Sequence, residues 1–400
     1  MTAKIAVSAN TAWYLANFRM NLFKKLKAWG YEVVALAPMG PEVARIETAG
    51  VRFVPIEMNK MCTNPFKEMG LLFRYVNALL RERPAVYLGY TVKPNVYGGM
   101  ACRLLGISSV NNIAGLGAVF IRETWLTKVA CRLYRLGLRR AARVFFQNEE
   151  DLGFFISRKM VRPEQVKRLP GSGVDTEWFA PDKCSFSLLK KEEDKLQPFI
   201  FLLSARLLWD KGIGEYVAAA RRLIEDGATV EFWLLGFFDE ENPAAIPASV
   251  VEAWTGEGVI RYLGRADDVR PVVAQADCVV LPSYYREGVP RSLLEAASMG
   301  KPIITTDAVG CRETVEDGVT GYLCRPRDAE DLADKMRRMV NASREAIEEI
   351  GRKGREKMMR EFDERIVIDL YLETVNALTE DVRSNPINSE HVAGAGSSRP

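Results

Sequence analysis

The sequence predicts an α/β protein made of two doubly wound, Rossmann-like domains. Strand-like and helix-like segments alternate along most of the chain, which is typical of a parallel sheet with helices on both faces. The 400 residues exceed what one hydrophobic core usually organises. A charged stretch at 181–198 separates two alternating series and predicts a linker between the domains.

The first series begins with a strand and a helix. Asn17 has a residue type favoured at a helix N-cap, and Gly30 is suited to end that helix. Short apolar runs predict strands at 4–8, 31–37, 51–56, 85–89, 108–112, 143–147 and 166–169. Apolar residues at helical spacing predict helices at 17–29, 42–49, 66–83, 94–105, 122–143 and 149–158.

The second series repeats the architecture without repeating the sequence. The same patterns predict strands at 199–204, 229–236, 259–263, 278–281, 302–305 and 321–324. They predict helices at 214–226, 268–276, 290–299, 328–340, 343–362 and 365–380. The predicted domains are therefore 1–180 and 198–363, with a C-terminal helix at 364–382 that crosses back to the first domain. Residues 383–400 are rich in Gly and Ser and predict a disordered tail.

Composition excludes several classes of function. A net charge of +3 does not by itself indicate nucleic-acid binding, and none is expected. Seven scattered cysteines without a C-x-x-C spacing indicate a reduced, intracellular protein. The only histidine, His391, lies in the polar tail, which excludes a Ser-His-Asp triad and a His-rich metal site. The sequence lacks an apolar run of about 20 residues and a signal-peptide core, so we expect a cytoplasmic location.

One stretch of the second series carries two carboxylates eight residues apart, Glu287 and Glu295. It follows a buried strand, and Pro290 suits the first turn of the next helix. With this spacing, one carboxylate could accept hydrogen bonds from each end of an elongated polar ligand. The helix N-terminus would then face an anionic group in the middle of that ligand. A sugar, a diphosphate and a ribose fit that order. The alternative is a solvated helix start with two exposed glutamates.

Further candidates follow other strands. Arg206 and Lys211 are five residues apart after the strand at 199–204, and together they suit a diphosphate. Two surface cations would look the same. In the first domain, 91–95 and 114–117 follow strands at the edge where open α/β sheets bind ligands. The glycine pair of 114–117 could equally form an ordinary tight turn.

The stretch 287–295, together with 296–304, 306–313 and 317–321, resembles the E-x7-E region of family 4 retaining glycosyltransferases. The resemblance covers nearly all of residues 1–380 and is more specific in the second half. It implies a GT-B fold, with the two domains facing each other across a cleft. It also implies a nucleotide-sugar substrate and no metal or other cofactor. The acidic pairs at 239–240 and 267–268 lack other ligand types nearby and predict no metal site.

The resemblance assigns roles to matching positions. Glu287 would contact the hydroxyls of the donor sugar, and Arg206 and Lys211 would neutralise the leaving diphosphate, so these three form the predicted catalytic group. Glu295 would hold the ribose, and the other implied donor contacts are Gly288, Val289, Pro290, Arg291, Leu263 and Gly264. Many family members also carry a histidine in the first domain, where this chain has 90–94 without one. The departing phosphate could then accept the proton of the acceptor, or an Asp or Glu could serve.

The first half is similar to bacterial enzymes that extend polyprenyl-diphosphate-linked glycans, of the N-acetylgalactosaminyltransferase type. The residues that carry this likeness lie at 10–19 and 115–117. The implied acceptor contacts are Asn17, Arg19, Lys93, Asn95, Gly115 and Gly117. The implied reaction moves a hexose or N-acetylhexosamine from a UDP-sugar to a lipid-linked saccharide, with retention. The alternatives are a nucleotide-sugar 2-epimerase and a non-catalytic nucleotide-sugar-binding scaffold.

The segment 122–143 is basic, with seven Lys and Arg against one acid, and Trp and Leu are interleaved. This pattern predicts an interfacial helix on an anionic membrane, which would place the enzyme on the inner face of the cell membrane. The alternative is a helix packed on the sheet with a solvated basic face.

Overall fold

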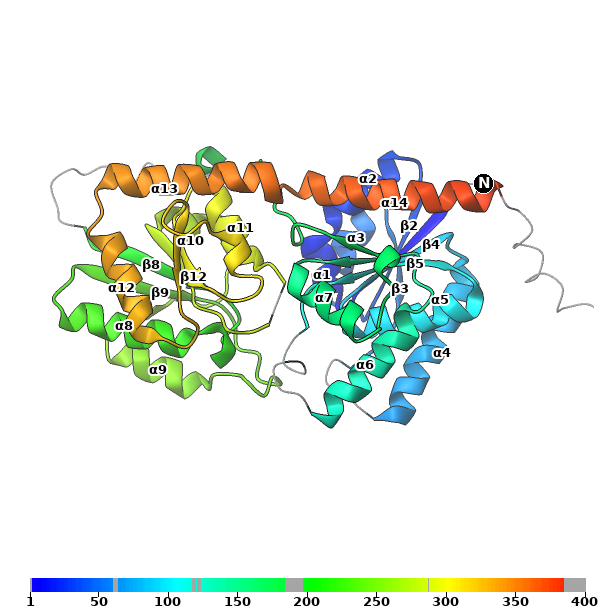
Figure 1. Ribbon diagram of the computed structural model, residues 1–400, viewed down its shortest axis with the longest axis horizontal. Helices are drawn as coiled ribbons and strands as arrows, with labels where there is room; N and C mark the ends of the chain where they lie inside the picture. The colour runs from blue at the N-terminus through cyan, green and yellow to red at the C-terminus, as the bar shows by residue number, and fades with distance from the viewer. Residues whose placement is uncertain are drawn as a thin grey trace, which may run out of the picture. The chain divides into compact units, whose positions relative to one another are not determined.

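The computed structural model describes residues 2–59, 64–116, 120, 124–183, 197–286 and 288–384 (Figure 1). It divides into two compact units. Unit 1 comprises the described residues of 1–114, 123–169 and 368–400, and unit 2 those of 115–122 and 170–367. Each unit contains one parallel sheet with helices packed against it, which confirms the predicted fold class.

Unit 1 is built on a seven-stranded sheet in the order β3-β2-β1-β4-β5-β6-β7. Its strands are β1 (Lys4–Ser8), β2 (Glu32–Ala37), β3 (Arg52–Pro55), β4 (Val86–Tyr90), β5 (Ser108–Ile113), β6 (Arg143–Phe146) and β7 (Val166–Arg168). Its helices are α1 (Ala12–Phe18), α2 (Met20–Ala28), α3 (Val43–Thr48), α4 (Pro65–Glu82), η1 (Pro94–Gly98), α5 (Gly99–Leu105), α6 (Trp125–Leu138), α7 (Glu149–Ser157) and η3 (Pro163–Gln165). The interior strand β1 pairs with both β2 and β4, and its residues after Lys4 are buried on both faces of the sheet.

The beginning of unit 1 differs from the prediction of one helix at 17–29. Thr11 caps α1, because its side chain accepts a hydrogen bond from the N–H of Tyr14 at 3.0 Å. The helix breaks at Arg19, and α2 starts at the next residue. Asn17 therefore lies inside α1 and is not a cap.

Two other helices of unit 1 differ from prediction at their ends. The predicted helix at 94–105 starts with the π-helical turn η1 before α5. The predicted helix at 122–143 is shorter, since α6 spans Trp125–Leu138 and Arg122 lies outside the described residues. Helix α5 contacts both α4 and α6 (Figure 1).

Unit 2 is built on a six-stranded sheet in the order β10-β9-β8-β11-β12-β13. Its strands are β8 (Phe199–Ser204), β9 (Val230–Leu235), β10 (Arg261–Tyr262), β11 (Cys278–Leu281), β12 (Ile303–Thr306) and β13 (Gly321–Cys324). Its helices are η4 (Pro181–Lys183), η6 (Trp209–Lys211), α8 (Ile213–Glu225), α9 (Ala248–Gly256), α10 (Arg270–Gln275), α11 (Arg291–Ser298), η7 (Arg312–Thr314), α12 (Ala329–Val340), α13 (Arg344–Lys357) and η8 (Met358–Phe362). Of these, α9 falls in a stretch where no helix was predicted. Its Trp254 meets Trp209 edge to face, with ring centroids 5.9 Å apart.

The chain changes unit earlier than the predicted boundary at residue 180. Residues 170–180 belong to unit 2, where Val174 pairs with the stretch before α14 (Glu364–Ser384). The N–H of Val174 donates to the carbonyl of Phe362, and the N–H of Glu364 donates to the carbonyl of Val174, both at 2.9 Å. Of the predicted linker, 184–196 lies outside the described residues.

Helix α14 begins in unit 2, and its residues from Ile368 on belong to unit 1. The buried ring of Tyr371 fixes it, since Asn112 on β5 donates to the Tyr371 hydroxyl at 2.9 Å. The helix continues to Ser384, so the predicted tail at 383–400 starts two residues too early. Residues 385–400 lie outside the described part of the chain.

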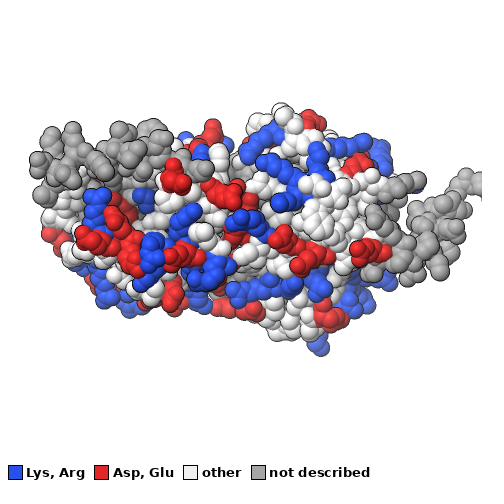
Figure 2. Space-filling view, turned by 90° about the horizontal axis from the view of Figure 1, so that it is seen from above, with Lys and Arg blue, Asp and Glu red and all other residues white. Residues whose placement is uncertain are grey.

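Charged side chains of both signs alternate along α13 (Figure 2). Arg344 pairs with Glu348 at 3.1 Å, and Arg352 pairs with Glu349 at 2.7 Å. Such exposed pairs contribute little to stability individually. They give α13 a nearly neutral outer face.

Candidate functional site

Two neighbouring strands of unit 2, β8 and β11, are followed by loops that pack against each other. The carbonyl oxygen of Asp210 accepts hydrogen bonds from the N–H groups of Tyr284 and Tyr285, both at 3.1 Å. The Ser283 hydroxyl donates to the same oxygen at 3.3 Å. The loop that carries Lys211 is thus attached to the loop that leads to 288–290.

Lys211 lies in the short helix η6 at this junction and is only 7% exposed. Its Nζ lies 5.4 Å from the centroid of the Tyr285 ring, within the range of a cation–π contact. A buried ammonium held beside a loop at the carboxyl end of a sheet is suited to an anionic ligand. The alternative interpretation requires Lys211 to be a surface cation. Its burial argues against that interpretation.

Arg206 is the second residue after β8, and its side chain is partly exposed. Its Nη1 donates to Oδ2 of Asp239 at 2.8 Å, which orients the guanidinium from the loop after β9. The N–H of Gly236 donates to the carbonyl of Gly264 at 2.8 Å, so the loops after β9 and β10 also meet. The structure therefore brings Arg206, Leu263 and Gly264 to adjacent positions at one sheet edge.

Helix α11 begins at the same edge, because it follows β11. Pro290 occupies its N-cap position, and the apolar face with Leu293 and Leu294 is fully buried. Gly171 packs on Val289 so closely that a Cβ at Gly171 would lie 2.8 Å from the Cβ of Val289. The loop at 170–173 thus supports the start of α11, where an anion would meet the positive end of the helix dipole.

The structure describes only one of the two predicted glutamates, Glu295. Glu295 lies on α11 and accepts a hydrogen bond from Nε of Arg291 at 2.8 Å, with 16% of its side chain exposed. Burial raises the pKa of Glu295, and the charge of Arg291 partly opposes that rise. Glu287 lies outside the described residues, so its role stays a prediction.

Two predicted acceptor residues are buried inside unit 1. The Arg19 guanidinium lies 4.1 Å from the ring centroid of Tyr90, donates to the Tyr14 hydroxyl at 2.9 Å, and is 3% exposed. Asn95 donates to the carbonyl of Asn112 at 2.7 Å and is also buried. Both side chains are buried in this structure, and direct acceptor contact by either stays a prediction.

The remaining predicted acceptor residues lie in different places. Asn17 is half-buried on α1 and accepts a hydrogen bond from Arg45 at 3.2 Å. Lys93 forms an ion pair with Glu68 of α4 at 2.5 Å. Gly115 has a φ of +113°, which favours glycine. Gly117 lies outside the described residues, and direct acceptor contact by Asn17, Lys93, Gly115 and Gly117 stays a prediction.

The sequence interpretation missed Asp239 as a partner of Arg206 and Gly171 as a support for Val289. Gly171 stands in a Pro-Gly-Ser-Gly turn, so its left-handed conformation could have been expected. No local pattern would have paired Asp239 with Arg206, because 33 residues separate them.

The described residues provide neither a metal-binding cluster nor a membrane-spanning helix. Within the described ranges, no group of three or more His, Cys, Asp or Glu side chains could hold a metal ion. None of the helices that the structure describes is both long enough and apolar enough to cross a membrane.

Comparisons with known proteins agree with this architecture. The family model described as "Glycosyl transferase 4-like domain" matches residues 15–171, and the model described as "Glycosyl transferases group 1" matches residues 198–342. Together they cover about three quarters of the chain.

Two curated relatives are each 25% identical to this chain. The N,N'-diacetylbacillosaminyl-diphospho-undecaprenol alpha-1,3-N-acetylgalactosaminyltransferase of Campylobacter jejuni matches over 374 residues, 92% of this chain and 96% of the relative. The UDP-Gal:alpha-D-GlcNAc-diphosphoundecaprenol alpha-1,3-galactosyltransferase of Escherichia coli matches over 293 residues, 72% and 74% of the two chains.

Solved structures share the fold. Anabaena Alr3699/HepE in complex with UDP and glucose superposes with a TM-score of 0.75 at 20% identity, over 94% of this chain and 99% of that one. A glycosyltransferase from Rickettsia africae superposes with a TM-score of 0.76 at 15% identity, again over 94% and 99%. Each half of the chain is matched by its own family model, and each half contains a Rossmann-like unit. This protein is therefore a glycosyltransferase of family 4 with the GT-B fold.

Proposed function

We propose that this enzyme transfers a hexose or an N-acetylhexosamine from a UDP-sugar to a polyprenyl-diphosphate-linked saccharide, with retention of configuration. The product would be an intermediate of a bacterial surface glycan or of a glycoprotein glycan. Support comes from the two curated relatives, whose names specify undecaprenyl-diphosphate-linked acceptors.

The observation that carries the proposal is the gathering of Arg206, Lys211 and the start of α11 at one edge of the unit 2 sheet. A diphosphate at this edge would meet a guanidinium, an ammonium and the positive end of a helix dipole. All three stabilise negative charge, which grows on the diphosphate as the sugar leaves. The adjoining loop with Leu263 and Gly264 would then face the nucleobase, and Glu295 the ribose.

The reaction needs a group that accepts the acceptor's proton. The only histidine, His391, lies outside the described residues and in the polar end of the chain. We propose that the phosphate oxygen that leaves the anomeric carbon takes the proton of the acceptor hydroxyl. The bond from the anomeric carbon to phosphate then breaks on the face where the new bond to the acceptor forms, which retains configuration. Arg206 and Lys211 assist by lowering the energy of the departing diphosphate.

Neither alternative is favoured. A nucleotide-sugar 2-epimerase would share the architecture, but both cited curated relatives are named as transferases to lipid-linked acceptors. The same names argue against a non-catalytic scaffold, although a scaffold that binds a nucleotide sugar could use the same lysine and arginine.

We also propose that unit 1 docks peripherally on the anionic inner face of the cell membrane. Helix α6 presents Trp125, Lys128, Val129 and Arg132 on one exposed face, at spacings of three and four residues. Trp125 is 71% exposed. Helix α4 adds exposed Phe66, Met69 and Phe73, also on one face, and Phe66 is 88% exposed. The N-terminal ends of both helices point to the lower edge of Figure 1, so apolar and basic groups lie at one end of unit 1.

The test is a screen of UDP-sugars against short polyprenyl-diphosphate-linked saccharides, with the anomeric configuration of the product read by NMR. A new α-linked disaccharide from an α-linked donor would support transfer with retention. Release of a free epimerised sugar without an acceptor would favour the epimerase instead. Binding of UDP without turnover on any acceptor would favour the scaffold.

A further inference from the structure

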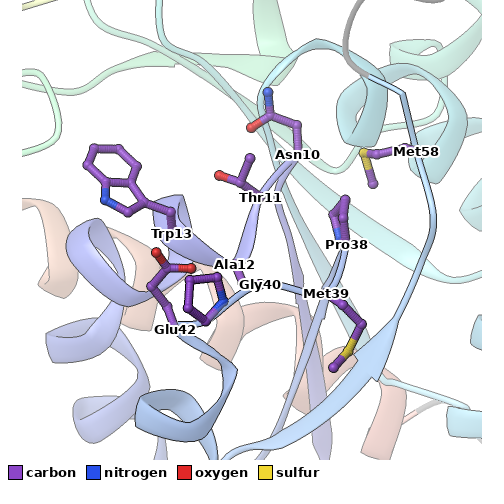
Figure 3. A pocket seen from close by; sticks show the side chains of 10 residues that line it. Asn10, Thr11, Ala12, Trp13, Pro38, Met39, Gly40, Glu42 and Met58 are labelled. Atoms are coloured by element: carbon purple, nitrogen blue, oxygen red, sulfur yellow. The ribbon is translucent and has the colours of Figure 1, made fainter. Parts of the chain in front are cut away.

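A pocket in unit 1 contains none of the predicted donor-binding or acceptor-binding residues. Its cavity of about 280 Å³ lies where the adjacent strands β1, β2 and β3 end. Ligands of open α/β sheets bind at this edge. The pocket is lined by Asn10, Thr11, Ala12, Trp13, Pro38, Met39, Gly40, Pro41, Glu42 and Met58 (Figure 3).

The pocket combines an aromatic ring, apolar side chains and two polar groups. Trp13 is 38% exposed, and its ring is held edge-on against Phe18 with centroids 5.3 Å apart. Trp13 and Glu42 lie next to each other on one side of the pocket, and Met58 lies on the opposite side (Figure 3). In the part of the chain that the structure describes, neither the Glu42 carboxylate nor the Asn10 side-chain amide has a protein partner.

The charge of the lining excludes an anionic ligand. Glu42 contributes a carboxylate, and no Lys or Arg is among the ten lining residues. A phosphate would be repelled here, whereas the hydroxyls of a neutral sugar can donate to the carboxylate. The C–H groups of a pyranose ring carry partial positive charge and pack on the electron-rich face of an indole. The volume is at the small end of ligand pockets, which suits one sugar ring.

The opposite wall indicates what the sugar carries. Met39, Met58 and Pro38 present an apolar surface whose side chains offer no hydrogen-bond partner to the hydroxyls of a plain hexose. An acetamido group would set its methyl against this wall, and its amide would face a polar neighbour such as Asn10. The N–H of Asn10 donates to the Thr91 hydroxyl at 3.2 Å, which attaches the pocket to the end of β4.

We propose that this pocket binds one neutral N-acetylated sugar residue of the acceptor, with Trp13 stacking on the ring and Glu42 accepting from its hydroxyls. The inference rests on the proposed function, because the sugar is a part of the acceptor. It adds a specificity-determining site whose lining residues are not among the predicted acceptor residues.

Saturation-transfer NMR on the full chain tests the pocket directly. The probes are the methyl glycosides of N-acetylglucosamine and N-acetylgalactosamine, with methyl glucoside and methyl galactoside as comparators. We expect saturation of the acetyl methyl group and a Kd at least about tenfold lower for the N-acetylated probes. Trp13→Ala and Glu42→Gln should each raise that Kd about tenfold or more.

Matched variants in the same unit serve as controls. Trp29→Ala removes another exposed tryptophan, and Glu47→Gln neutralises another exposed glutamate, and both should bind the probes as the wild type does. Unfolding midpoints show whether each variant is folded. With a transfer assay, Trp13→Ala should raise the KM for the acceptor and leave the KM for the UDP-sugar unchanged.

UDP binding, measured by calorimetry, separates this inference from the proposed function. If UDP binds but no glycoside does, or if Trp13→Ala and Glu42→Gln both bind the probes like the wild type, the pocket proposal is wrong and the proposed function stands. If UDP does not bind the wild type, the proposed function fails. Equal binding of N-acetylated and plain glycosides would overturn the assigned acetamido preference.

Discussion

A Cβ placed on Gly212 would lie 2.1 Å from the carbonyl oxygen of Pro282, and Gly212 itself has a φ of +75°. Only glycine satisfies both conditions. The contact joins the loop after β8 to the loop after β11. The position of Lys211 beside Tyr285 therefore depends on the absence of a side chain at the next residue.

Gly212→Ala should destabilise unit 2 and weaken UDP binding. The left-handed backbone costs about 1 kcal/mol with alanine, and the clash with Pro282 adds to it because backbone must move. Gly227→Ala is the matched control, since Gly227 has a φ of +79° and a Cβ added there would meet nothing within 4 Å. Denaturant unfolding and UDP calorimetry should show a larger loss for Gly212→Ala in both measurements. Equal losses in the two variants would mean that the contact with Pro282 is unimportant.

Arg206→Ala and Lys211→Ala should each slow turnover about 10²-fold or more and weaken UDP binding, because each removes a cation from the diphosphate. Asp239→Ala should have a smaller effect of the same kind, since it releases the Arg206 guanidinium from its 2.8 Å contact. Arg221→Ala, which breaks an exposed ion pair with Glu257, is the control and should be active. Wild-type turnover in both Arg206→Ala and Lys211→Ala would remove these residues from the site.

Glu295→Ala and Glu287→Ala should impair different steps. Ribose is common to UDP and UDP-sugar, so Glu295→Ala should weaken the binding of both. Glu287→Ala should leave UDP binding nearly intact and reduce transfer, because its predicted contact is with the sugar. Calorimetry with UDP and with UDP-sugar, together with kcat, distinguishes the two. The same loss of UDP affinity in both variants would contradict the assignment.

The raised pKa of Glu295 predicts a pH dependence of stability. Burial disfavours the charged carboxylate, so the folded state holds its proton to a higher pH than the unfolded state does. The contribution of Glu295 to the unfolding free energy is therefore greatest below its ordinary pKa near 4.5 and declines as pH rises through the raised value. Glu295→Gln should remove this decline. Unfolding curves of the two proteins across that range should differ in slope, with the wild type losing more stability towards neutral pH.

Much of the fold could be predicted because parallel strands buried on both faces leave a simple apolar pattern. Runs such as 278–281 and 302–305 predicted β11 and β12 to within one or two residues. The stretch 287–295 also identified the strand-loop-helix unit that places Pro290 at the start of α11. These features depend on residues close together in the sequence.

Features that depend on distant residues were not predictable. The break between α1 and α2 occurs at Arg19, whose guanidinium is buried against Tyr90, 71 residues away in sequence. In the sequence Arg19 resembles a surface cation, and no local pattern indicates that it is buried. In the sequence Asp239 is only one member of an acidic pair without a predicted role, although its partner is Arg206.

Membrane docking should depend on the basic face of α6. Lys128 and Arg132 are exposed and lie one turn apart. Arg135 is unsuitable for charge reversal, because it donates to the carbonyls of Arg158 and Lys159 at 2.7 and 3.0 Å and so supports the fold. Each cation near an anionic surface is worth about 1 kcal/mol, so reversing two charges should strongly reduce binding.

The variant K128E/R132E should therefore no longer sediment with anionic liposomes at low salt. A second variant, Phe66→Ser combined with Trp125→Ser, should bind the liposomes more weakly because apolar insertion is lost. The matched control is K24E/K25E, which reverses two exposed charges on α2 of the same unit. Binding of the wild type should fall as salt is raised, because exposed charges are screened. Transfer to a long-chain lipid acceptor should slow in K128E/R132E, while transfer to a short water-soluble analogue should not. If the wild type ignores anionic liposomes at low salt, or if K24E/K25E loses binding equally, α6 is a packed helix with a solvated basic face and the docking proposal is wrong.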